Sequence, residues 1–340
     1  MSTADLSVFL ANYNHARYLP RALDAILSQS VRPREVIVLD DTSTDDSPRI
    51  LSEYAHKHDH VRVVRNERNL GVVATYNRGI AMAQGKYLFL AAADDFVVPG
   101  FFEKAVAQLE AHPQAGMCCG YESFQKGDDG QVVEAPSGWC AEPTYFSPDA
   151  FALKLRSALA AHAAICRRDA MVKAGGYLAD LAWYSDWFAY LTIAFRHGIV
   201  HVPATLAVRT LGLAEQYSAG AGKGEKHVAV LGALLDRLMS PEYADIAPYF
   251  RRTAVIAQFG PDLIRAAARR PDRMDPAVLG LVNGLPPEQC EGLLSDTDPN
   301  VRELAGFFLA AFWRETVTRR AELEAEVVRL REELEHARRH

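Results

Sequence analysis

The chain has 340 residues, of which 49% are hydrophobic and 24% charged, and its formal net charge is −6 at pH 7. This length predicts two or three domains, and a composition near the globular average excludes a disordered, collagen-like or disulfide-dominated protein. The negative charge argues against a nucleic-acid binder, because affinity for phosphate backbones depends on clustered Lys and Arg. No apolar run in the sequence reaches the roughly 18 residues of a membrane span.

The N-terminus and the cysteines predict a cytoplasmic protein. The first residues, MSTADLSVFLANYN, have no basic segment followed by a long apolar one, so we expect no secretory signal. The five cysteines form no CxxC pair and no metal-ligand spacing. An odd number of cysteines without a signal predicts reduced thiols.

The first hundred residues alternate patterns typical of strands and of helices. Short apolar runs predict buried strands at 6–11, 35–39, 61–64 and 86–91. Apolar residues with helical spacing predict helices at 18–29, from 47 onward and at 71–83. Strands separated by helices predict βαβ units and a mainly parallel sheet, hence an α/β fold. Ligands of such sheets bind beyond the carboxyl ends of the strands.

The middle of the chain mixes several patterns. Residues 127–130 (GDDG) predict a turn between two strands. Further along, the sequence predicts a helix at 146–159, a strand at 162–168, an amphipathic helix at 186–196 and a short strand at 199–202. A Gly-rich stretch at 218–224 is typical of a mobile lid or linker.

The last third of the chain reads as helical. Ala, Leu and Arg dominate from about residue 225, and β-branched runs disappear, which predicts helices up to about residue 315. In the final stretch Leu323, Val327, Leu330 and Leu334 alternate by four and three residues, with Glu and Arg between them. This spacing predicts a coiled coil.

Paired acids follow two of the predicted strands. Asp40 and Asp41 come after the second strand, and Asp94 and Asp95 after the fourth. Adjacent carboxylates are costly at a strand end unless they meet a cation or hydrogen-bond donors. A helix cap or a turn explains one acid of a pair. A hard divalent cation shared with phosphates explains the pairs at neighbouring strand ends, so together they favour a nucleotide-diphosphate site. A phosphorelay receiver is disfavoured, because its paired acids follow the first strand.

These motifs, in this order, resemble family 2 glycosyltransferases of the GT-A fold. The resemblance rests on LSVFLANYNHARYLPRALDAILSQ, on VIVLDDTSTDDS and on RNERNLGVVATYNRGIAMAQGKYLFLAAADD. Gly175-Gly176 and the stretch WYSDWFAYLTIAFRHG extend it to about residue 218. The resemblance implies a GT-A domain at 1–218, which would precede a helical region at 219–315 and a coiled-coil helix at 316–340.

The resemblance implies an inverting, hexosyltransferase-type enzyme. It would move a sugar from a nucleotide-diphospho-sugar, UDP-linked in most members, to a hydroxyl of a glycan or lipid-linked glycan in polysaccharide or glycoconjugate synthesis. Asp186 would be the general base, and Asp94 and Asp95 would hold Mn²⁺ or Mg²⁺. The donor would be bound by Ala11, Asn12, Tyr13, Asp40, Asn69, Gly71, Ala93 and Asp94. The acceptor side would include His162, Trp183, Tyr184 and Trp187.

The sequence departs from the family pattern at four places. Ala92 replaces the first acid of the DxD metal motif, and Ala11-Asn12 stands where the family usually has Pro-Thr. Tyr76 stands where many members have an Arg, and the stretch 209–218 lacks the His that many members have there, although Arg209 could supply a charge instead. These departures leave the donor and the metal requirement open.

Structural interpretations compete with the functional ones. Asp186 alone is typical of a helix N-cap, His162 of a structural histidine and Trp187 of a core residue. The alternative function is a GT-A scaffold without turnover that oligomerises through its tail, whereas a nucleotidyltransferase would need a basic, Gly-rich loop after the first strand. We expect self-association through the tail. A lone amphipathic helix packed on its own domain and peripheral membrane association also stay open, since coils of two heptads are marginal.

Overall fold

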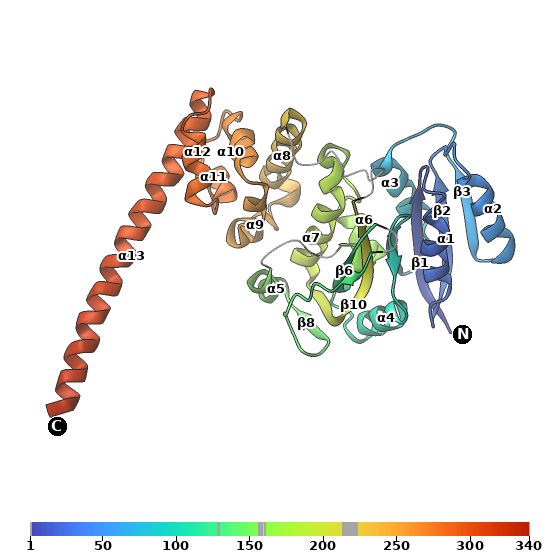
Figure 1. Cartoon of the computed structure of the whole chain (residues 1–340), viewed down its shortest axis with the longest axis horizontal. Coiled ribbons are helices and arrows are strands. Elements are labelled where there is room, and N and C mark those ends of the chain that lie inside the picture. The colour runs from blue at the N-terminus through green and yellow to red at the C-terminus, as the bar shows by residue number, and fades with distance from the viewer. Residues whose placement is uncertain (1, 128–129, 156–158, 160, 213–223, 340) are drawn as a thin grey trace. The chain divides into compact units, whose positions relative to one another are not determined.

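The computed structural model describes residues 2–127, 130–155, 159, 161–212 and 224–339 (Figure 1). The chain folds into two compact units: residues 1–223 with 241–255, and residues 224–240 with 256–340. Across the described part of the chain, no helix combines the length and the hydropathy that spanning a bilayer requires. The predicted lid at 218–224 lies, apart from Gly224, outside the described residues.

The first unit contains the strands and the helices that pack on them. Its strands are β1 (Thr3–Asn12), β2 (Arg32–Asp40), β3 (Val61–Arg65), β4 (Tyr87–Ala92), β5 (Phe96–Val97), β6 (Met117–Lys126), β7 (Val132–Val133), β8 (Thr144–Phe146), β9 (Ala164–Arg167) and β10 (Ile199–Leu211). Its helices are α1 (Leu19–Leu27), α2 (Ser47–Lys57), α3 (Val72–Met82), α4 (Phe101–Ala111), α5 (Pro148–Lys154), α6 (Arg168–Lys173), α7 (Ser185–His197) and α9 (Ala247–Thr253), with short 3₁₀ turns at Ala161–Ala163, Ala179–Tyr184 and Pro241–Tyr243.

Within the described residues the strands form one mixed sheet in the order β3-β2-β1-β4-β9-β6-β10-β5. β1, β2, β3 and β4 are parallel to one another. β9 is antiparallel to both β4 and β6, while β10 runs parallel to β6. The predicted α/β class is confirmed, and the parallel arrangement holds for the first half of the sheet.

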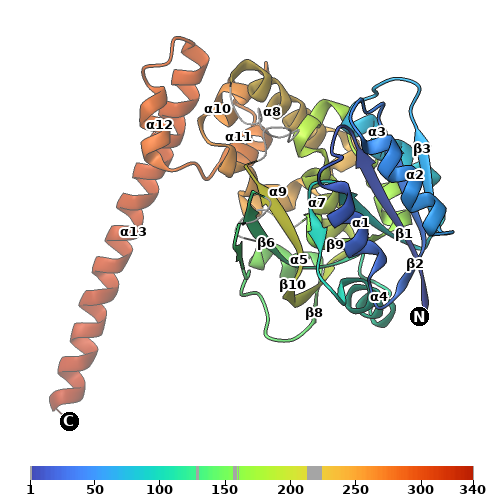
Figure 2. The same ribbon diagram turned by 45° about the vertical axis from the view of Figure 1, so that its right-hand side comes forward.

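Helices cover both faces of the parallel strands (Figures 1 and 2). On β1, Val8 and Leu10 pack in one core with Leu19 and Leu23 of α1. The ring of Phe9, which alternates to the opposite face, lies against α3, where a Cβ on Gly79 would come within 2.1 Å of it. β1 is thus buried on both sides, which explains its continuous apolar run.

The register of the parallel strands gathers the predicted site at one edge of the sheet. Asn12, at the end of β1, lies opposite Asp40 at the end of β2. Ala11 lies opposite Ala92 at the end of β4. The carboxyl ends of these strands therefore meet, as the α/β pattern predicts.

Three predicted elements have different bounds in the structure. The strand expected at 199–202 continues to Leu211, because it pairs with the whole length of β6. The strand expected at 162–168 is shorter, since His162 lies in a 3₁₀ turn and Arg168 begins α6. The helix expected at 146–159 is α5, which starts at Pro148 after the strand β8 and ends at Lys154. The two strands predicted on either side of the turn at 127–130 are β6 and β7, which pair antiparallel, while residues 128 and 129 of the turn lie outside the described residues.

Residues 241–255 belong to the first unit although they follow a helix of the second. Phe250 packs against the rings of Trp187, Phe188 and Phe195 on α7, with centroid distances of 5.4–5.9 Å. Arg196 of α7 forms a salt bridge with Asp245. The helical region predicted as one block from residue 219 is therefore divided between two compact units.

The second unit is helical, as its composition predicts. It contains α8 (Gly224–Met239), α10 (Pro261–Ala268), α11 (Pro276–Val282), α12 (Pro287–Leu293) and α13 (Pro299–Arg339). A buried ion pair joins His227 of α8 to Asp262 of α10 at 2.9 Å, and Arg265 bridges Asp262 to Asp296. α13 runs through residue 316 without a break, so the predicted coiled-coil segment is the end of a longer helix.

All five cysteines are unpaired, as predicted, and one of them contacts a buried histidine. The ring of His201 on β10 is hydrogen-bonded to Ser137 Oγ at 3.1 Å and to Cys140 Sγ at 3.3 Å. Burial lowers the pKa of His201 to about 4 from its ordinary value of 6.5. The folded chain thus keeps this imidazole neutral at pH values at which the unfolded chain protonates it.

We therefore expect the free energy of unfolding to fall when the pH drops below 6.5, because only the unfolded chain takes up this proton. Between pH 7 and pH 5 one such histidine accounts for roughly 2 kcal/mol. Denaturant titrations at the two pH values should show a smaller decrease for His201→Gln than for the unmodified chain. His56→Gln, at an exposed position, is the matched control; equal decreases in all three chains would contradict the assignment.

Candidate functional site

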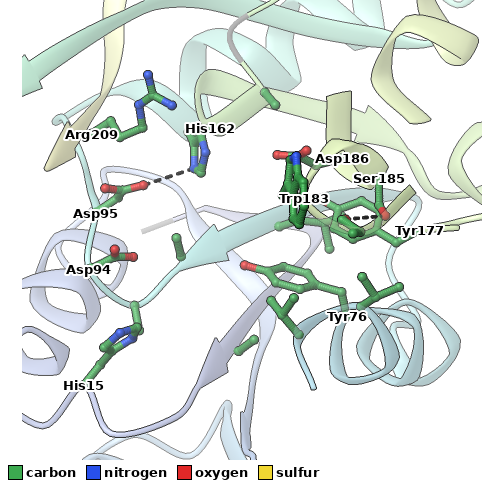
Figure 3. A pocket seen from close by; sticks show the side chains of 18 of the residues that line it. His15, Tyr76, Asp94, Asp95, His162, Tyr177, Trp183, Ser185, Asp186 and Arg209 are labelled. Carbon is green, nitrogen blue, oxygen red and sulfur yellow. Dashed lines mark hydrogen bonds and ion pairs between the residues drawn. The ribbon is translucent and has the colours of Figure 1, made fainter. Parts of the chain in front are cut away.

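A pocket of about 280 Å³ opens at the carboxyl ends of β1 and β4 (Figure 3). Side chains from α3, α7, β10 and the 3₁₀ turns complete its wall. The predicted residues that line it are Ala11, Ala93, Asp94, Asp95, His162, Trp183 and Asp186. Residues distant in the sequence thus meet in one cavity, with acids on two sides of it.

Asp94 and Asp95 are adjacent in sequence but differ in their surroundings. Both oxygens of Asp95 are engaged: Oδ1 accepts from the backbone N–H of Thr210 at 2.8 Å, and Oδ2 pairs with Nδ1 of His162 at 3.1 Å. Asp94 lines the pocket, and burial together with the neighbouring charge of Asp95 raises its pKa. A carboxylate held in this way gains stability when a cation approaches it.

His162 supplies a positive charge at this end of the pocket. Burial by itself would lower the pKa of the imidazole, but the negative charges of Asp95, Glu122 and Asp186 outweigh it and raise the pKa to about 10. The imidazolium is therefore charged at neutral pH. Arg209, on β10, adds a second cation and lies 3.7 Å from Glu122.

Arg21 on α1 fixes the backbone of the acidic loop. Its Nη2 donates to the carbonyl oxygen of Asp94 at 3.0 Å and to Oγ1 of Thr210 at 2.8 Å. Thr210 Oγ1 itself donates to the same Asp94 carbonyl at 2.8 Å. The guanidinium also lies over the ring of Phe96, 4.6 Å from its centroid. Arg21 thereby ties the loop after β4 to the end of β10.

Asp186 is the second residue of α7 and lines the pocket on the side away from β1. Tyr184 occupies the N-cap position, so the N-cap interpretation of Asp186 does not describe the structure. Its Oδ1 accepts a hydrogen bond from the backbone N–H of Trp187 at 2.7 Å. This hydrogen bond orients the Asp186 carboxylate through its Oδ1 oxygen.

The three aromatic residues around Asp186 lie in different places. Trp183 lines the pocket in front of Asp186 (Figure 3). Trp187 is buried and packs edge-on against Phe250, which is the core position that its alternative interpretation implied. Tyr184 lies between them, with ring centroids 6.0 Å from Trp183 and 6.3 Å from Trp187. Trp183 is therefore the aromatic residue of this group that a ligand in the pocket meets.

A strained backbone precedes Trp183. Ala182 has φ 45° and ψ −117°, a conformation that costs a residue with a Cβ of order 1–3 kcal/mol. Ser185 holds the turn closed, since its Oγ donates to the carbonyls of Leu178 at 2.6 Å and Ala182 at 2.7 Å. The turn directs the indole of Trp183 into the cavity, and strain of this kind concentrates at functional sites.

The first predicted donor acid, Asp40, is buried beside the pocket and is 1% exposed. Asn12 Nδ2 donates to Asp40 Oδ1 at 3.0 Å, and the backbone N–H of Ser43 donates to Oδ2 at 3.2 Å. Arg65 lies 3.5 Å from the same carboxylate. Asn12 and Asp40 are thus brought together as predicted, in a network that shapes the loops after β1 and β2.

Asp41 organises the loop that carries Asn69 and Gly71. Its oxygens accept from the backbone N–H groups of Leu70 and Gly71, both at 2.9 Å, and from Nδ2 of Asn66 at 2.6 Å. Asn69 Oδ1 also accepts from Gly71 N–H at 3.0 Å. Asp41 therefore holds this loop in place, and the loop ends where α3 begins.

The described lining of the pocket does not include several predicted residues. These are Asn12, Tyr13, Asp40, Asn69, Gly71, Tyr184 and Trp187. Tyr13 is 46% exposed on the loop after β1. Most of the predicted nucleobase-binding residues thus lie along the loops after β1 and β2, next to the pocket rather than in its wall.

The lining also includes residues that were not among the predicted site residues, and His15, Tyr76 and Tyr177 are three of them. His15 follows the LANYN motif and faces Asp94 across the pocket (Figure 3). Tyr76 of α3 donates its hydroxyl to the carbonyl of Ala91 at 2.9 Å, and Tyr177 stacks beside it with centroids 5.1 Å apart. Looking only at strand ends misses Tyr76 on α3 and Tyr177 in the segment after α6. The replacement of an Arg by Tyr76 was the one signal that the sequence offered.

The Gly175-Gly176 pair anchors the wall beside Tyr177. Asn77 binds the backbone of Tyr177 twice, accepting from its N–H at 2.8 Å and donating to its carbonyl at 2.7 Å. Gly176 has φ +64°, and a Cβ there would lie 2.7 Å from Asn77 Oδ1. Only glycine fits this turn.

The donor set of the pocket fits a divalent cation that has phosphate ligands of its own. The described residues contain no group of three or more His, Cys, Asp or Glu side chains arranged to hold a metal ion. Asp94 can offer its carboxylate, whereas both oxygens of Asp95 are engaged. A hard cation that keeps few protein ligands and takes the rest from a bound diphosphate matches this arrangement.

Comparisons with known proteins agree with this geometry. A model of glycosyl transferase family 2 matches residues 7–173. YibD, an uncharacterized glycosyltransferase of Escherichia coli strain K12, is 29% identical over 204 residues, which are 55% of this chain and 57% of YibD. The chain spans about a third of the length of other curated relatives that it matches, at 34% of each.

Two solved structures share the fold. S. aureus TarS 1–349 in complex with UDP-GlcNAc has a TM-score of 0.62 at 17% identity, over 91% of this chain and 89% of that chain. GalNAc-T7 with UDP, GalNAc and Mn²⁺ has a TM-score of 0.54 at 18% identity, over 74% of this chain and 51% of that chain. At these identities the likeness concerns the fold alone.

Proposed function

The chain carries a GT-A domain of glycosyl transferase family 2, and on this premise we propose that it transfers a sugar from a nucleotide-diphospho-sugar to a hydroxyl acceptor with inversion. The observation that carries the proposal is that Asp94, at the end of β4, and Asp186, on α7, line one pocket. UDP-linked donors are the first choice, because the structures similar to this chain bind UDP or UDP-GlcNAc.

The β4 side of the pocket is the proposed donor side. Breaking the sugar–diphosphate bond leaves negative charge on the diphosphate, which a divalent cation, when bound, stabilises as a Lewis acid. Asp94 would hold Mn²⁺ or Mg²⁺, and Asp95 would position Asp94 through its bonds to His162 and Thr210. The lining carries two cations, those of His162 and Arg209, and three carboxylates, those of Asp94, Asp95 and Asp186. Because the carboxylates outnumber the two cations, these groups do not supply the positive charge that a diphosphate needs.

The nucleobase and ribose would lie along the loops after β1 and β2. Asn12 and Asp40 form a rigid floor there, since each is held by hydrogen bonds within the loops. Tyr13, with 46% of its surface exposed, can stack on a base. Ala11 and Ala93 have small side chains at the strand ends, which allow the phosphates to approach the backbone.

Asp186 is the proposed general base. The acceptor hydroxyl must lose its proton as it attacks the anomeric carbon, and a carboxylate within reach can take it. Asp186 stands on α7, away from the β4 end where the diphosphate would leave. A single displacement from that side inverts the anomeric configuration without a covalent intermediate.

The acceptor is proposed to be a glycan or lipid-linked glycan, in polysaccharide or glycoconjugate synthesis. Trp183 offers an aromatic face beside Asp186, and such faces stack on the apolar side of sugar rings. His162 and Arg209 border the same space and can donate hydrogen bonds to hydroxyl or charged groups of the acceptor.

The proposal is tested with the full chain and a panel of nucleotide diphosphates. Isothermal titration calorimetry with and without Mn²⁺ should show metal-dependent binding of one nucleotide, and UDP is the expected one. Incubation with the matching labelled nucleotide-sugar should then release the nucleotide and form glycoside of inverted configuration. A chain that binds no nucleotide under either condition would overturn the proposal and favour a scaffold without turnover.

Arg21 gives a prediction that separates positioning from folding. Arg21→Met removes the hydrogen bond from Arg21 to the Asp94 carbonyl and the one from Arg21 to Thr210 Oγ1, the hydroxyl that donates to the same carbonyl. We expect the affinity for the nucleotide in the presence of Mn²⁺ to fall by about 10- to 100-fold, as is typical for groups that orient a metal ligand. Affinity without Mn²⁺ should change little. Arg17→Met, an exposed arginine just before α1, is the control, and equal losses with and without metal would contradict a positioning role.

We also propose that the chain self-associates through its C-terminal helix. The support is the four-three spacing of Leu323, Val327, Leu330 and Leu334 and the continuity of α13 through these positions.

A further inference from the structure

α13 carries a row of exposed apolar side chains beyond the part that is buried in its own unit. Val301, Leu304, Ala305 and Leu309 are buried. After Leu309, large apolar residues are exposed: Phe312 by 40%, Trp313 by 54%, Val317 by 66% and Leu323 by 53%. Exposed residues of this size on one helix mark an interaction surface.

The heptad pattern predicted for the tail extends back into this row. If Leu323 and Leu330 are d positions and Val327 and Leu334 are a positions, Trp313 is an a position and Leu309 a d position. Phe312 then falls at g and Val317 at e, which flank the seam. All four exposed apolar residues therefore lie on the side of the helix that a coiled-coil partner would cover.

The residue types along the seam indicate two strands. Val at an a position with Leu at the neighbouring d positions favours dimers over higher oligomers. Arg320 falls at an a position and Thr316 at a d position. A polar residue at such a place lowers stability and fixes the register.

The flanking charges indicate the orientation. In a parallel, in-register pair each g position meets the e position five residues further along the partner helix. The g positions 319, 326 and 333 carry Arg, Glu and Glu, and the corresponding e positions 324, 331 and 338 carry Glu, Arg and Arg. Every one of these pairings joins opposite charges.

The preceding g and e positions carry apolar residues that would also meet in a parallel pair. Phe312 at g would meet Val317 at e of the second copy, and both are exposed in the single chain. An antiparallel pair places g against g instead, and a register that aligns Glu326 or Glu333 of one copy with Glu326 or Glu333 of the other brings like charges together. Like charges in contact destabilise a helix pair.

From these observations we infer that two copies of this chain associate through a parallel, in-register coiled coil that runs from Phe312 to Leu334. The seam is longer than the two heptads of the tail, which overcomes the marginal stability of short coils. Within one chain Arg319 pairs with Glu322 and Glu326 with Arg329. Such exposed pairs are weak, so they do not prevent the contacts between chains. The inference rests on the self-association proposed above and is independent of sugar transfer.

Cross-linking of the full chain tests the orientation. Thr316→Cys places a thiol at a d position, where a parallel in-register pair brings the two copies together. We expect mild oxidation to give a disulfide-linked dimer in high yield. Thr318→Cys, at an outward f position two residues away, is the matched control and should give little. The hydroxyl of each threonine donates to the carbonyl one turn back in its own helix, so the variants should fold alike.

Light scattering on the same samples separates the possible failures. A monomeric mass for the unmodified chain at micromolar concentration would overturn both the self-association and the parallel arrangement. A dimer whose residue 316 does not cross-link would overturn the parallel arrangement and leave self-association standing. Leu330→Glu, which puts a charge into the seam, should shift the dimer to a monomer; an unchanged mass would place the interface elsewhere.

Charge reversal tests the pairing of positions 326 and 331. Glu326→Arg and Arg331→Glu each turn attraction into repulsion, and we expect each to raise the dimer dissociation constant about tenfold. The double variant Glu326→Arg with Arg331→Glu restores opposite charges only in the parallel register and should return to within about threefold of the unmodified chain. A double variant as weak as the single ones would contradict the parallel register. Transfer activity, measured alongside, reports separately on the catalytic proposal.

Discussion

Asp186→Asn is expected to lower the rate of sugar transfer by about 10²- to 10⁴-fold, the usual contribution of a general base. The amide keeps the shape of the side chain and can still accept the hydrogen bond from the Trp187 N–H. What it loses is the ability to take the proton of the acceptor hydroxyl. Initial rates with saturating donor and acceptor measure this loss.

Donor binding by the Asp186→Asn chain is expected to stay within about twofold of normal, because the proposed donor side is formed by the β4 loop. Calorimetry with the nucleotide and Mn²⁺ checks this. Asp180→Asn, at an exposed position on the preceding turn, should keep full activity. If Asp186→Asn transfers sugar at the normal rate, another group accepts the proton, and the role of Asp186 is wrong.

Asp94→Asn is expected to abolish most of the metal-dependent nucleotide binding. A carboxylate about 4 Å from a unit positive charge contributes roughly 4 kcal/mol at an effective dielectric constant of 20, which corresponds to about a 10³-fold change in affinity. The amide retains an oxygen ligand but not the charge. Titrations with the nucleotide at fixed Mn²⁺, for both chains, give the ratio of dissociation constants.

The same substitution is expected to make the free protein more stable. Burial and the charge of Asp95 raise the pKa of Asp94, so the ionised group costs folding free energy at neutral pH. For a carboxyl group whose pKa is raised on folding, stability is highest at low pH and is lost as the pH rises through the folded pKa. Asn removes this loss, and thermal unfolding without metal should show a higher Tm at pH 7.

Asp5→Asn, an exposed acid whose ion pair with Arg34 lies at the surface, should change neither binding nor Tm beyond experimental error. A lower Tm for Asp94→Asn would show that the carboxylate stabilises the loop even without a bound cation, which would contradict the prediction. Sites that bind charge commonly sacrifice stability in this way.

The sequence predicted the parts of the molecule that depend on local periodicity. Apolar runs bounded by turns gave the strands β1 to β4, and the stripe of Leu19, Ala22, Leu23 and Ile26 gave α1 with its buried face. A short periodic pattern of apolar residues is enough to predict these elements, because the period of the side chains determines which face is buried. The order of strands and helices placed the two acid pairs at strand ends that were expected to be neighbours. In the sheet β1 lies between β2 and β4, so the two strands are not neighbours, although their carboxyl ends meet at the same edge.

Elements that depend on distant partners were predicted less well. β10 is longer than its apolar run, because β6 offers hydrogen bonds along its whole length. Residues 241–255 look like the helices around them, yet Phe250 packs among the aromatic rings of α7. A short sequence pattern gives no information about the distant segment that packs against it, so these features could not be predicted from it.

The sequence by itself therefore determined the α/β order, the strand-end acids, the helical second unit and the heptad seam of the tail, since each follows from spacing along the chain. Only the tertiary structure decided how the two acids of a pair differ in their surroundings. Asp94 and Asp95 are equivalent as residue types, but His162 and Thr210 occupy both oxygens of Asp95. The tertiary structure also brought Tyr76, His15 and Tyr177 together in the wall of the pocket. Long-range packing selects the neighbours of a side chain, and those neighbours decide what it can bind.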